Sequence, residues 1–158
     1  MDNIRVGGID PREIEARTGT GYPEPFRENV FARAKRVLGD AFGLSRYGVN
    51  LVDLSPGTWS SQRHWHTHED EFIVVISGQL TLITDAGEQL LTPGMVAGFP
   101  AGDSNGHHLI NKSNETASYL EIGDRNSQDE VFYPDIDLLY KLNDAGEHEF
   151  TNRDGVPY

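Results

Sequence analysis

Between residues 45 and 122 the sequence is divided by turn residues into short segments in which apolar and polar side chains alternate. A period of two is typical of a β-strand with one buried face, because successive side chains of a strand point to opposite sides. Glycine- and proline-containing turns separate these segments: Ser55-Pro56-Gly57, Ser77-Gly78, Asp85-Ala86-Gly87, Thr92-Pro93-Gly94 and Pro100-Ala101-Gly102. We predict strands over 47–54, 62–65, 71–77, 79–84, 88–92, 96–99, 107–111 and 117–122. About eight short strands are enough to close a double-sheet jelly roll, so the sequence predicts an all-β barrel.

The length of 158 residues corresponds to one domain. We expect the barrel over 47–122, an N-terminal extension over 1–46 that packs on the barrel or on a partner, and a C-terminal extension over 123–158. In the C-terminal extension, four apolar residues predict an element packed on the outside of the barrel: Ile136, Leu138, Leu139 and Leu142.

The N-terminal extension contains two candidate elements. Asp10 is placed to cap a short helix that begins at Pro11. Farther along, apolar residues in 26–44 recur at three- and four-residue intervals, as expected for an amphipathic helix. Val30 and Phe31 fit an edge strand equally well, so both alternatives stand at this point.

The composition limits the partners and the chemistry. The chain has 13 Lys and Arg against 25 Asp and Glu, and a net charge of −12 repels nucleic acid and anionic membranes. It contains no cysteine, so any metal ion is held by His, Asp or Glu. Residues 1–5 do not resemble a secretory signal, and no apolar run approaches the ~20 residues of a membrane helix. We therefore expect a cytoplasmic protein.

Two clusters of histidines suggest a metal site. His64 and His66 are two residues apart, and on a strand they direct both imidazoles into one space. Glu71 begins a strongly apolar segment, where a buried carboxylate is costly unless it is paired or bound to a cation. A histidine from the second cluster, His107 and His108, completes a His₃Glu set suited to a first-row divalent ion. Taken alone, His-x-His in an acidic stretch is more often a solvated surface feature.

The order of these residues resembles the two sequence motifs of the cupin family. Segment 57–78 resembles the first motif and contains, in order, Gly57, His64, His66, Glu71 and Gly78. Segment 94–111 resembles the second and contains Gly94, Pro100, Gly102, His107 and Asn111. The resemblance covers residues 47–122 and implies a double-stranded β-helix, the jelly-roll barrel of cupins.

The resemblance also implies that His64, His66, Glu71 and His107 bind one divalent transition metal, such as Mn, Fe, Ni or Zn. Two spacings are longer than the usual motif: six residues separate Gly57 from His64, and four separate Gly102 from His107. The second difference lengthens the loop that leads to His107. An alternative chelate uses His66 and His68, but it leaves only two residues before Glu71.

Several polar residues near the motifs are candidates for contact with a substrate. We expect His68 at the mouth of the site, and Tyr47 and Asn105 within reach of the open side of the metal. Because side chains alternate along a strand, Arg63 and Trp65 point away from the metal. We expect Arg63 to form ion pairs at the surface and Trp65 to pack against neighbouring residues. We expect His108 in a packing or supporting role.

These observations favour a small metal-dependent enzyme that acts on a compact polar metabolite, either a hydroxy or keto acid or a sugar phosphate. Isomerase-type or oxygenase-type chemistry would fit, and the resemblance extends to cupins regarded as sugar-phosphate isomerases. The alternative is a binding or sensor module without turnover. We also expect a homodimer, because residues 23–44 contain more apolar side chains than one small barrel needs to cover itself.

Overall fold

The computed structural model describes residues 4–158, so the first three residues of the predicted extension 1–46 lie outside the described part. Apart from a 3₁₀ turn at Pro11–Glu13 and the helix α1 (Leu38–Ala41), its regular elements are strands, which confirms the all-β prediction. The strands are β1 (Arg17–Thr18), β2 (Ala34–Val37), β3 (Tyr47–Leu54), β4 (Trp65–His66), β5 (Glu71–Ser77), β6 (Leu80–Thr84), β7 (Gly87–Leu91), β8 (Val96–Phe99), β9 (His108–Ile110), β10 (Ala117–Asp124), β11 (Val131–Tyr133), β12 (Leu138–Leu142) and β13 (His148–Thr151). No helix among these residues is long and apolar enough to cross a membrane.

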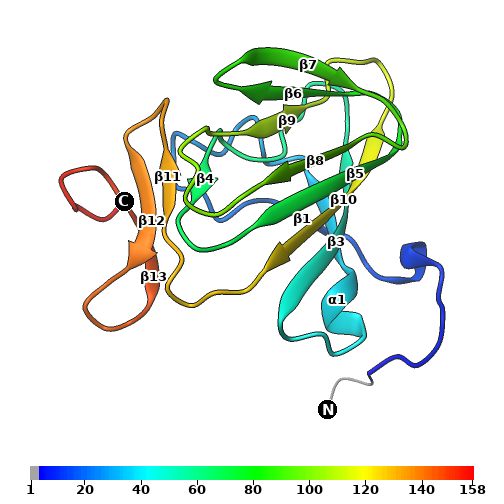
Figure 1. The fold of residues 1–158 in the computed structure, drawn as a ribbon, viewed down its shortest axis with the longest axis horizontal. Helices are drawn as coiled ribbons and strands as arrows, with labels where there is room; N and C mark the ends of the chain where they lie inside the picture. Colours follow the sequence, from blue (N-terminus) through cyan, green and yellow to red (C-terminus); the bar gives the residue numbers. More distant parts are fainter. Residues whose placement is uncertain (1–3) are drawn as a thin grey trace.

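Two antiparallel sheets enclose the core. The larger sheet has six strands in the order β1-β2-β3-β10-β5-β8, and the smaller has three in the order β7-β6-β9. In Figure 1 the smaller sheet lies above β8 and β5. Alternate residues of the central strands point between the sheets and are buried, as the period-two pattern requires. They form one apolar core: Val52, Leu54, Ile73, Val75, Leu80, Leu82, Leu91, Leu109, Ala117 and Tyr119.

The predicted strands of the barrel agree closely with the structure. Strands β3, β5 and β8 have the predicted ends, and β6, β7, β9 and β10 differ from the prediction by at most two residues at either end. The predicted strand 62–65 is the exception, because β4 contains only Trp65 and His66. His64, which immediately precedes β4, forms an isolated antiparallel bridge with His107 and is not part of a continuous ladder.

The N-terminal extension differs from both alternatives for 26–44, the amphipathic helix and the edge strand at Val30 and Phe31. Turns occupy 24–32, followed by β2 and the four-residue helix α1. Strand β2 pairs with β3 from Ala34↔Asp53 to Val37↔Asn50, so the backbone satisfies its hydrogen bonds in a ladder. Gly39 and Gly43 disfavour a long helix over 26–44, and residues 34–37 pair with β3 instead. The predicted cap is confirmed, since the Asp10 side chain accepts a hydrogen bond from the Arg12 backbone.

The C-terminal extension forms its own sheet with a strand of the barrel. Strands β13, β12, β11 and β4 pair in that order, and they lie at the end of the molecule opposite α1 (Figure 1). Their buried residues Val131, Tyr133 and Leu138 pack with Tyr22 and Phe26 of the N-terminal extension. The C-terminal extension is therefore joined through β11 to β4, the strand that carries His66.

Candidate metal centre

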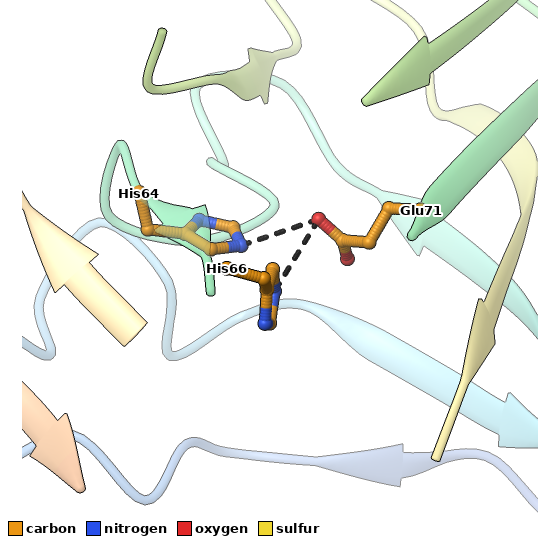
Figure 2. Close-up of side chains that lie close together, drawn as sticks. All are labelled: His64, His66 and Glu71. Atoms are coloured by element: carbon orange, nitrogen blue, oxygen red, sulfur yellow. Dashed lines mark ion pairs between the residues drawn. The ribbon is translucent and has the colours of Figure 1, made fainter. Parts of the chain in front are cut away.

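Three histidine nitrogens converge on one carboxylate oxygen inside the barrel. The Nε2 atoms of His64 and His66 each lie 3.4 Å from Oε2 of Glu71, and Nε2 of His107 lies 2.5 Å from it. Figure 2 shows the first two imidazoles pointing at the carboxylate from one side. The ligand atoms of His64, His66 and Glu71 all lie within 4.8 Å of one another, as metal ligands do. The structure thus brings together all four residues that the sequence singled out as ligands.

Local backbone pairing places each of these side chains. Glu71 is the first residue of β5, and His66 belongs to β4. The His64 amide donates to the His107 carbonyl (3.1 Å) and the His107 amide donates to the His64 carbonyl (2.8 Å). This pair of hydrogen bonds sets His107 opposite His64, so the longer loop before His107 does not remove its ring from the cluster.

The longer loop over 103–106 is itself anchored. The Arg63 guanidinium donates to the Gly106 carbonyl (3.1 Å) and pairs with Asp85 (2.5 Å) and Asp135 (2.7 Å). The Asn105 side chain accepts a hydrogen bond from the Asp85 backbone (2.8 Å). Arg63 therefore forms the ion pairs expected for it, and they connect the loop, the turn after β6 and the C-terminal extension.

Hydrogen bonds on the far side of two rings direct their free nitrogens inward. Nδ1 of His64 lies 2.9 Å from the Gln62 carbonyl, and Nδ1 of His66 lies 2.6 Å from Asp129 Oδ2. A carbonyl or carboxylate only accepts, so in the neutral ring the proton is on Nδ1 and Nε2 presents a lone pair. Two such lone pairs face the Glu71 carboxylate, and Nε2 of His66 is buried without a hydrogen-bond partner. A donor set of this kind fits a cation, with outer partners that fix the ring tautomers.

The pKa values of Glu71 and His66 also show that the cluster favours positive charge beside the Glu71 carboxylate. Burial opposes ionisation of Glu71, but contacts with His107, His64 and His66 hold the pKa of its carboxyl well below the ordinary value. Burial lowers the pKa of His66, yet Glu71 and Asp129 outweigh this and raise its pKa to about 9. Burial lowers the pKa of His107, whose ring stacks on Phe99 with centroids 3.6 Å apart.

A cavity of about 360 Å³ opens beside the cluster. Aromatic side chains from both extensions line it, including Tyr22, Tyr133 and Phe150. Its wall also contains ionisable residues that the sequence analysis did not select: Arg33, Lys35, Glu69, Tyr119 and Glu121. Alternation could have placed Tyr119 and Glu121 on the interior face of β10, but the sequence gives no indication that β2 brings Lys35 beside them.

The three residues expected to contact substrate do not line this cavity, and their contact with a substrate stays a prediction. His68 is exposed, and its ring contacts Thr67 Oγ1 (2.7 Å). Tyr47 is exposed at the start of β3 and borders another hollow, which shares Glu71 and Phe99 with the first. Asn105 lines a second hollow that shares His66 and His107 with the first. None of the three lines the cavity that contains all four ligand residues.

The two remaining aromatic candidates have packing roles. Trp65 stacks on Phe132 with centroids 4.8 Å apart and points away from the cluster, as expected. His108 is buried against Trp59, and its Nδ1 lies 2.9 Å from the Ser61 carbonyl. The structure therefore places His108 in the supporting position that the sequence predicted, although its ring reaches the cavity wall.

Comparisons with known proteins support the fold. The cupin domain model matches residues 50–123. A sugar phosphate isomerase of a cupin superfamily from Silicibacter pomeroyi is 42% identical, with 96% of each chain covered and a TM-score of 0.90. A provisionally named sugar phosphate isomerase from Acidithiobacillus ferrooxidans is 33% identical over 80% of each chain, with a TM-score of 0.72.

More distant matches extend the similarity of fold. A polyketide cyclase from Streptomyces resistomycificus is 19% identical, with 76% of this chain and 80% of that chain covered and a TM-score of 0.61. At that identity the match concerns the fold alone. No curated protein matches the sequence. Together these matches confirm the resemblance to cupins and the jelly-roll architecture.

Proposed function

The chain belongs to the cupin superfamily, and from this membership and the geometry of the site we propose that it is a metal-dependent isomerase of small sugar phosphates. The names of two relatives support the substrate class, and one of them is similar to this chain over almost its whole length. Because cupins share one fold and differ in chemistry, the proposal depends chiefly on the side chains in the cavity.

The observation that carries the proposal is the orientation of His64 and His66. Their Nδ1 atoms are engaged by the Gln62 carbonyl and the Asp129 carboxylate, so that both Nε2 atoms face Glu71. Together with His107, these residues would hold a divalent ion. Such an ion supplies Lewis acidity, which polarises a carbonyl or hydroxyl group of a bound substrate.

The chain itself offers a proton acceptor in the same cavity. Isomerisation of a sugar moves a proton between neighbouring carbons, and this requires a base beside the substrate. Glu121 is partly buried in the wall, where Lys35 Nζ lies 2.7 Å from its carboxylate and Asn50 donates to it at 3.0 Å. Burial raises the pKa of Glu121, but Lys35 outweighs this and the pKa is lowered. The carboxylate is therefore ionised at neutral pH, the form in which it can act as a base.

Aromatic side chains form part of the cavity wall. The ring centroid of Tyr22 lies 5.7 Å from that of Tyr133 and 5.5 Å from that of Phe150. These rings provide apolar surface for the carbon chain of a substrate.

The test combines metal analysis with an assay of isomerisation. We expect the purified chain, without a histidine tag, to bind close to one divalent transition metal ion per chain, as measured by elemental analysis. We expect it to interconvert at least one aldose phosphate and its ketose partner, followed by NMR. His64→Ala should lose both metal and activity, whereas Glu121→Gln should keep the metal and lose turnover at least about 100-fold.

The exposed residue His68 provides the matched control. Because its ring lies outside the cavity, His68→Ala should leave metal content unchanged. Loss of metal in His68→Ala and its retention in His64→Ala would assign the chelate to His66 and His68. A chain that binds metal and sugar phosphates without converting any of them would instead be a ligand-binding cupin.

A further inference from the structure

The cavity wall contains a guanidinium without a carboxylate partner. Arg33 precedes β2, and its Nη1 donates to the Ser60 carbonyl at 2.6 Å. Within residues 4–158 Arg33 forms no ion pair, and its buried Nε has no hydrogen-bond acceptor. A guanidinium has five N–H donors, so several donors of Arg33 remain available to a molecule in the cavity.

The other cations near the cluster are already neutralised. Lys35 lies in the same cavity, but its ammonium is 2.7 Å from Glu121. Arg63 is paired with two aspartates outside the cavity. Among the described residues, Arg33 is therefore the cavity-lining Lys or Arg that forms no ion pair, although its charge acts on Glu121 through space.

A second unpartnered donor lies in the same wall. The Tyr119 hydroxyl is buried beside Ser60 and forms no hydrogen bond with good geometry within the described chain. Tyr119 lies on the interior face of β10, at the level of Val52 in β3 and Val75 in β5. Buried polar groups usually have partners, and these two donors, which lack a protein partner of good geometry, are placed to serve a polar ligand in the cavity.

Arg33 is also linked to the metal ligands. It contacts the Ser60 carbonyl, and the side chain of the next residue, Ser61, lies 3.2 Å from Nδ1 of His64. A small substrate that reaches the ligand cluster at one end can therefore extend toward Arg33 at the other.

We propose that Arg33, with the Tyr119 hydroxyl, binds the anionic group of the substrate, a phosphate monoester or a carboxylate, while the metal ligands serve its carbonyl end. This inference rests on the proposed function, because it identifies how the same cavity selects its substrate. The planar guanidinium matches the two oxygens of such a group and forms charge-assisted hydrogen bonds, which a lysine reproduces only in part. Arg33 is then the residue that determines specificity for an anionic substrate.

Binding of simple anions provides a direct test. Zinc-loaded protein is titrated by calorimetry with methyl phosphate and with acetate, and the titration is repeated after zinc is removed with a chelator. We expect Arg33→Gln to weaken binding of the preferred anion about 10- to 100-fold, the range for hydrogen bonds to a charged group. Arg33→Lys should weaken anion binding less than Arg33→Gln does. Tyr119→Phe should weaken binding about 3- to 10-fold and, because it removes only an unpartnered hydroxyl, should fold normally.

Arg36 on β2, the strand that follows Arg33, is the matched control. It pairs with Asp53 at 2.5 Å and does not line the cavity, so Arg36→Gln should bind anions like the unaltered chain. Unchanged zinc affinity in all variants would show that the barrel is intact. Tighter binding of methyl phosphate than of acetate would identify a phosphate monoester, and the reverse order a carboxylate.

Two results would overturn the inference. One is the absence of anion binding by the unaltered chain, and the other is equal binding by the unaltered chain, Arg33→Gln and Tyr119→Phe, which would place the anion at the histidines or the metal. The proposed function fails if the chain does not bind zinc or does not convert a substrate. The present inference would still hold in that case if the zinc-free protein binds anions and Arg33→Gln weakens that binding.

Discussion

At the scale of single residues, Asp129 controls how His66 faces the site. One carboxylate oxygen of Asp129 accepts from His66 Nδ1 at 2.6 Å, and the other accepts from the His68 amide at 2.8 Å. An asparagine has only one side-chain oxygen and cannot serve both donors. We therefore expect Asp129→Asn to lower zinc affinity about 10- to 100-fold, measured by competition with a chelator.

The control for this substitution is Asp124→Asn. The Asp124 carboxylate also accepts a backbone hydrogen bond, from Asp70 at 2.7 Å, but it does not contact any of the histidine rings. Zinc affinity should remain at the value of the unaltered chain. Equal zinc affinities of the Asp129 and Asp124 variants would contradict a positioning role for Asp129.

Glu121 provides a residue-scale prediction about pH. Burial raises its pKa, but Lys35 outweighs burial, so the pKa in the folded chain is below the ordinary value of 4.5. A carboxyl with a lowered folded pKa stabilises the fold above its unfolded pKa, and this contribution is lost as the pH falls through the folded value. We expect Glu121→Gln to lower the free energy of unfolding by roughly 1 kcal/mol at pH 7. The difference between the two proteins should shrink below about pH 4 in denaturant titrations. A difference that stays constant with pH would show that the Lys35 contact does not stabilise the charged form.

At the scale of elements, the turn between β5 and β6 depends on Gly78. Its φ of +73° lies in the left-handed region, and a Cβ added there would be 2.7 Å from the Ala117 Cα and 2.9 Å from the Thr116 carbonyl oxygen. Both neighbours are backbone atoms at the start of β10, the strand that pairs with β3 and β5. We expect Gly78→Ala to destabilise the chain by roughly 2–4 kcal/mol, combining backbone strain with overpacking, as measured by chemical denaturation.

The substitution Gly57→Ala serves as a control that measures backbone strain without overpacking. The φ of Gly57, +81°, is similar, but an added Cβ would meet no atom within 4 Å. Gly57→Ala should therefore cost only the conformational part, about 1 kcal/mol. Equal losses at the two positions would show that the close approach of Gly78 to β10 does not matter for stability.

At the scale of the whole molecule, the homodimer predicted from residues 23–44 stays a prediction, and a second apolar surface can support it. Within 23–44, Val30 is fully buried and Phe26 packs against the C-terminal cluster, whereas Phe31 is 55% exposed. On the outer face of the large sheet, Phe72, Ile76 and Val96 are 42%, 47% and 54% exposed. Strands β5 and β8 are paired there, which makes these side chains neighbours.

Light scattering with dilution tests the dimer. We expect twice the mass of one chain at micromolar concentration, and the mass of one chain when Ile76→Lys and Val96→Lys are combined. Leu90→Lys is the control, because Leu90 is as exposed as Val96 but lies on β7 of the other sheet. A monomeric unaltered chain at all concentrations would contradict the dimer.

Local patterns in the sequence were enough to predict the strands of the barrel, except for 62–65, and the candidate ligands. The turn residues that bound β3, β5 and β8 and the two-residue spacing of His64 and His66 are local properties of the chain, so they can be recognised without knowing which strands pair. The motif spacing added Glu71 and His107, and all four side chains meet in the structure.

Only the tertiary structure decided what surrounds that cluster. Arg33, Lys35 and Glu121 line one cavity because β2 pairs with β3, and β3 with β10, across long separations in sequence. The same long-range pairing places a strand at Ala34–Val37, within the segment 26–44 for which a helix and an edge strand at Val30 and Phe31 were both open, because a backbone that finds a partner in a sheet does not need helical hydrogen bonds. It also left Tyr47 and His68 outside the cavity. Which side chains share a cavity depends on contacts between distant strands, and no local pattern of residues encodes those contacts.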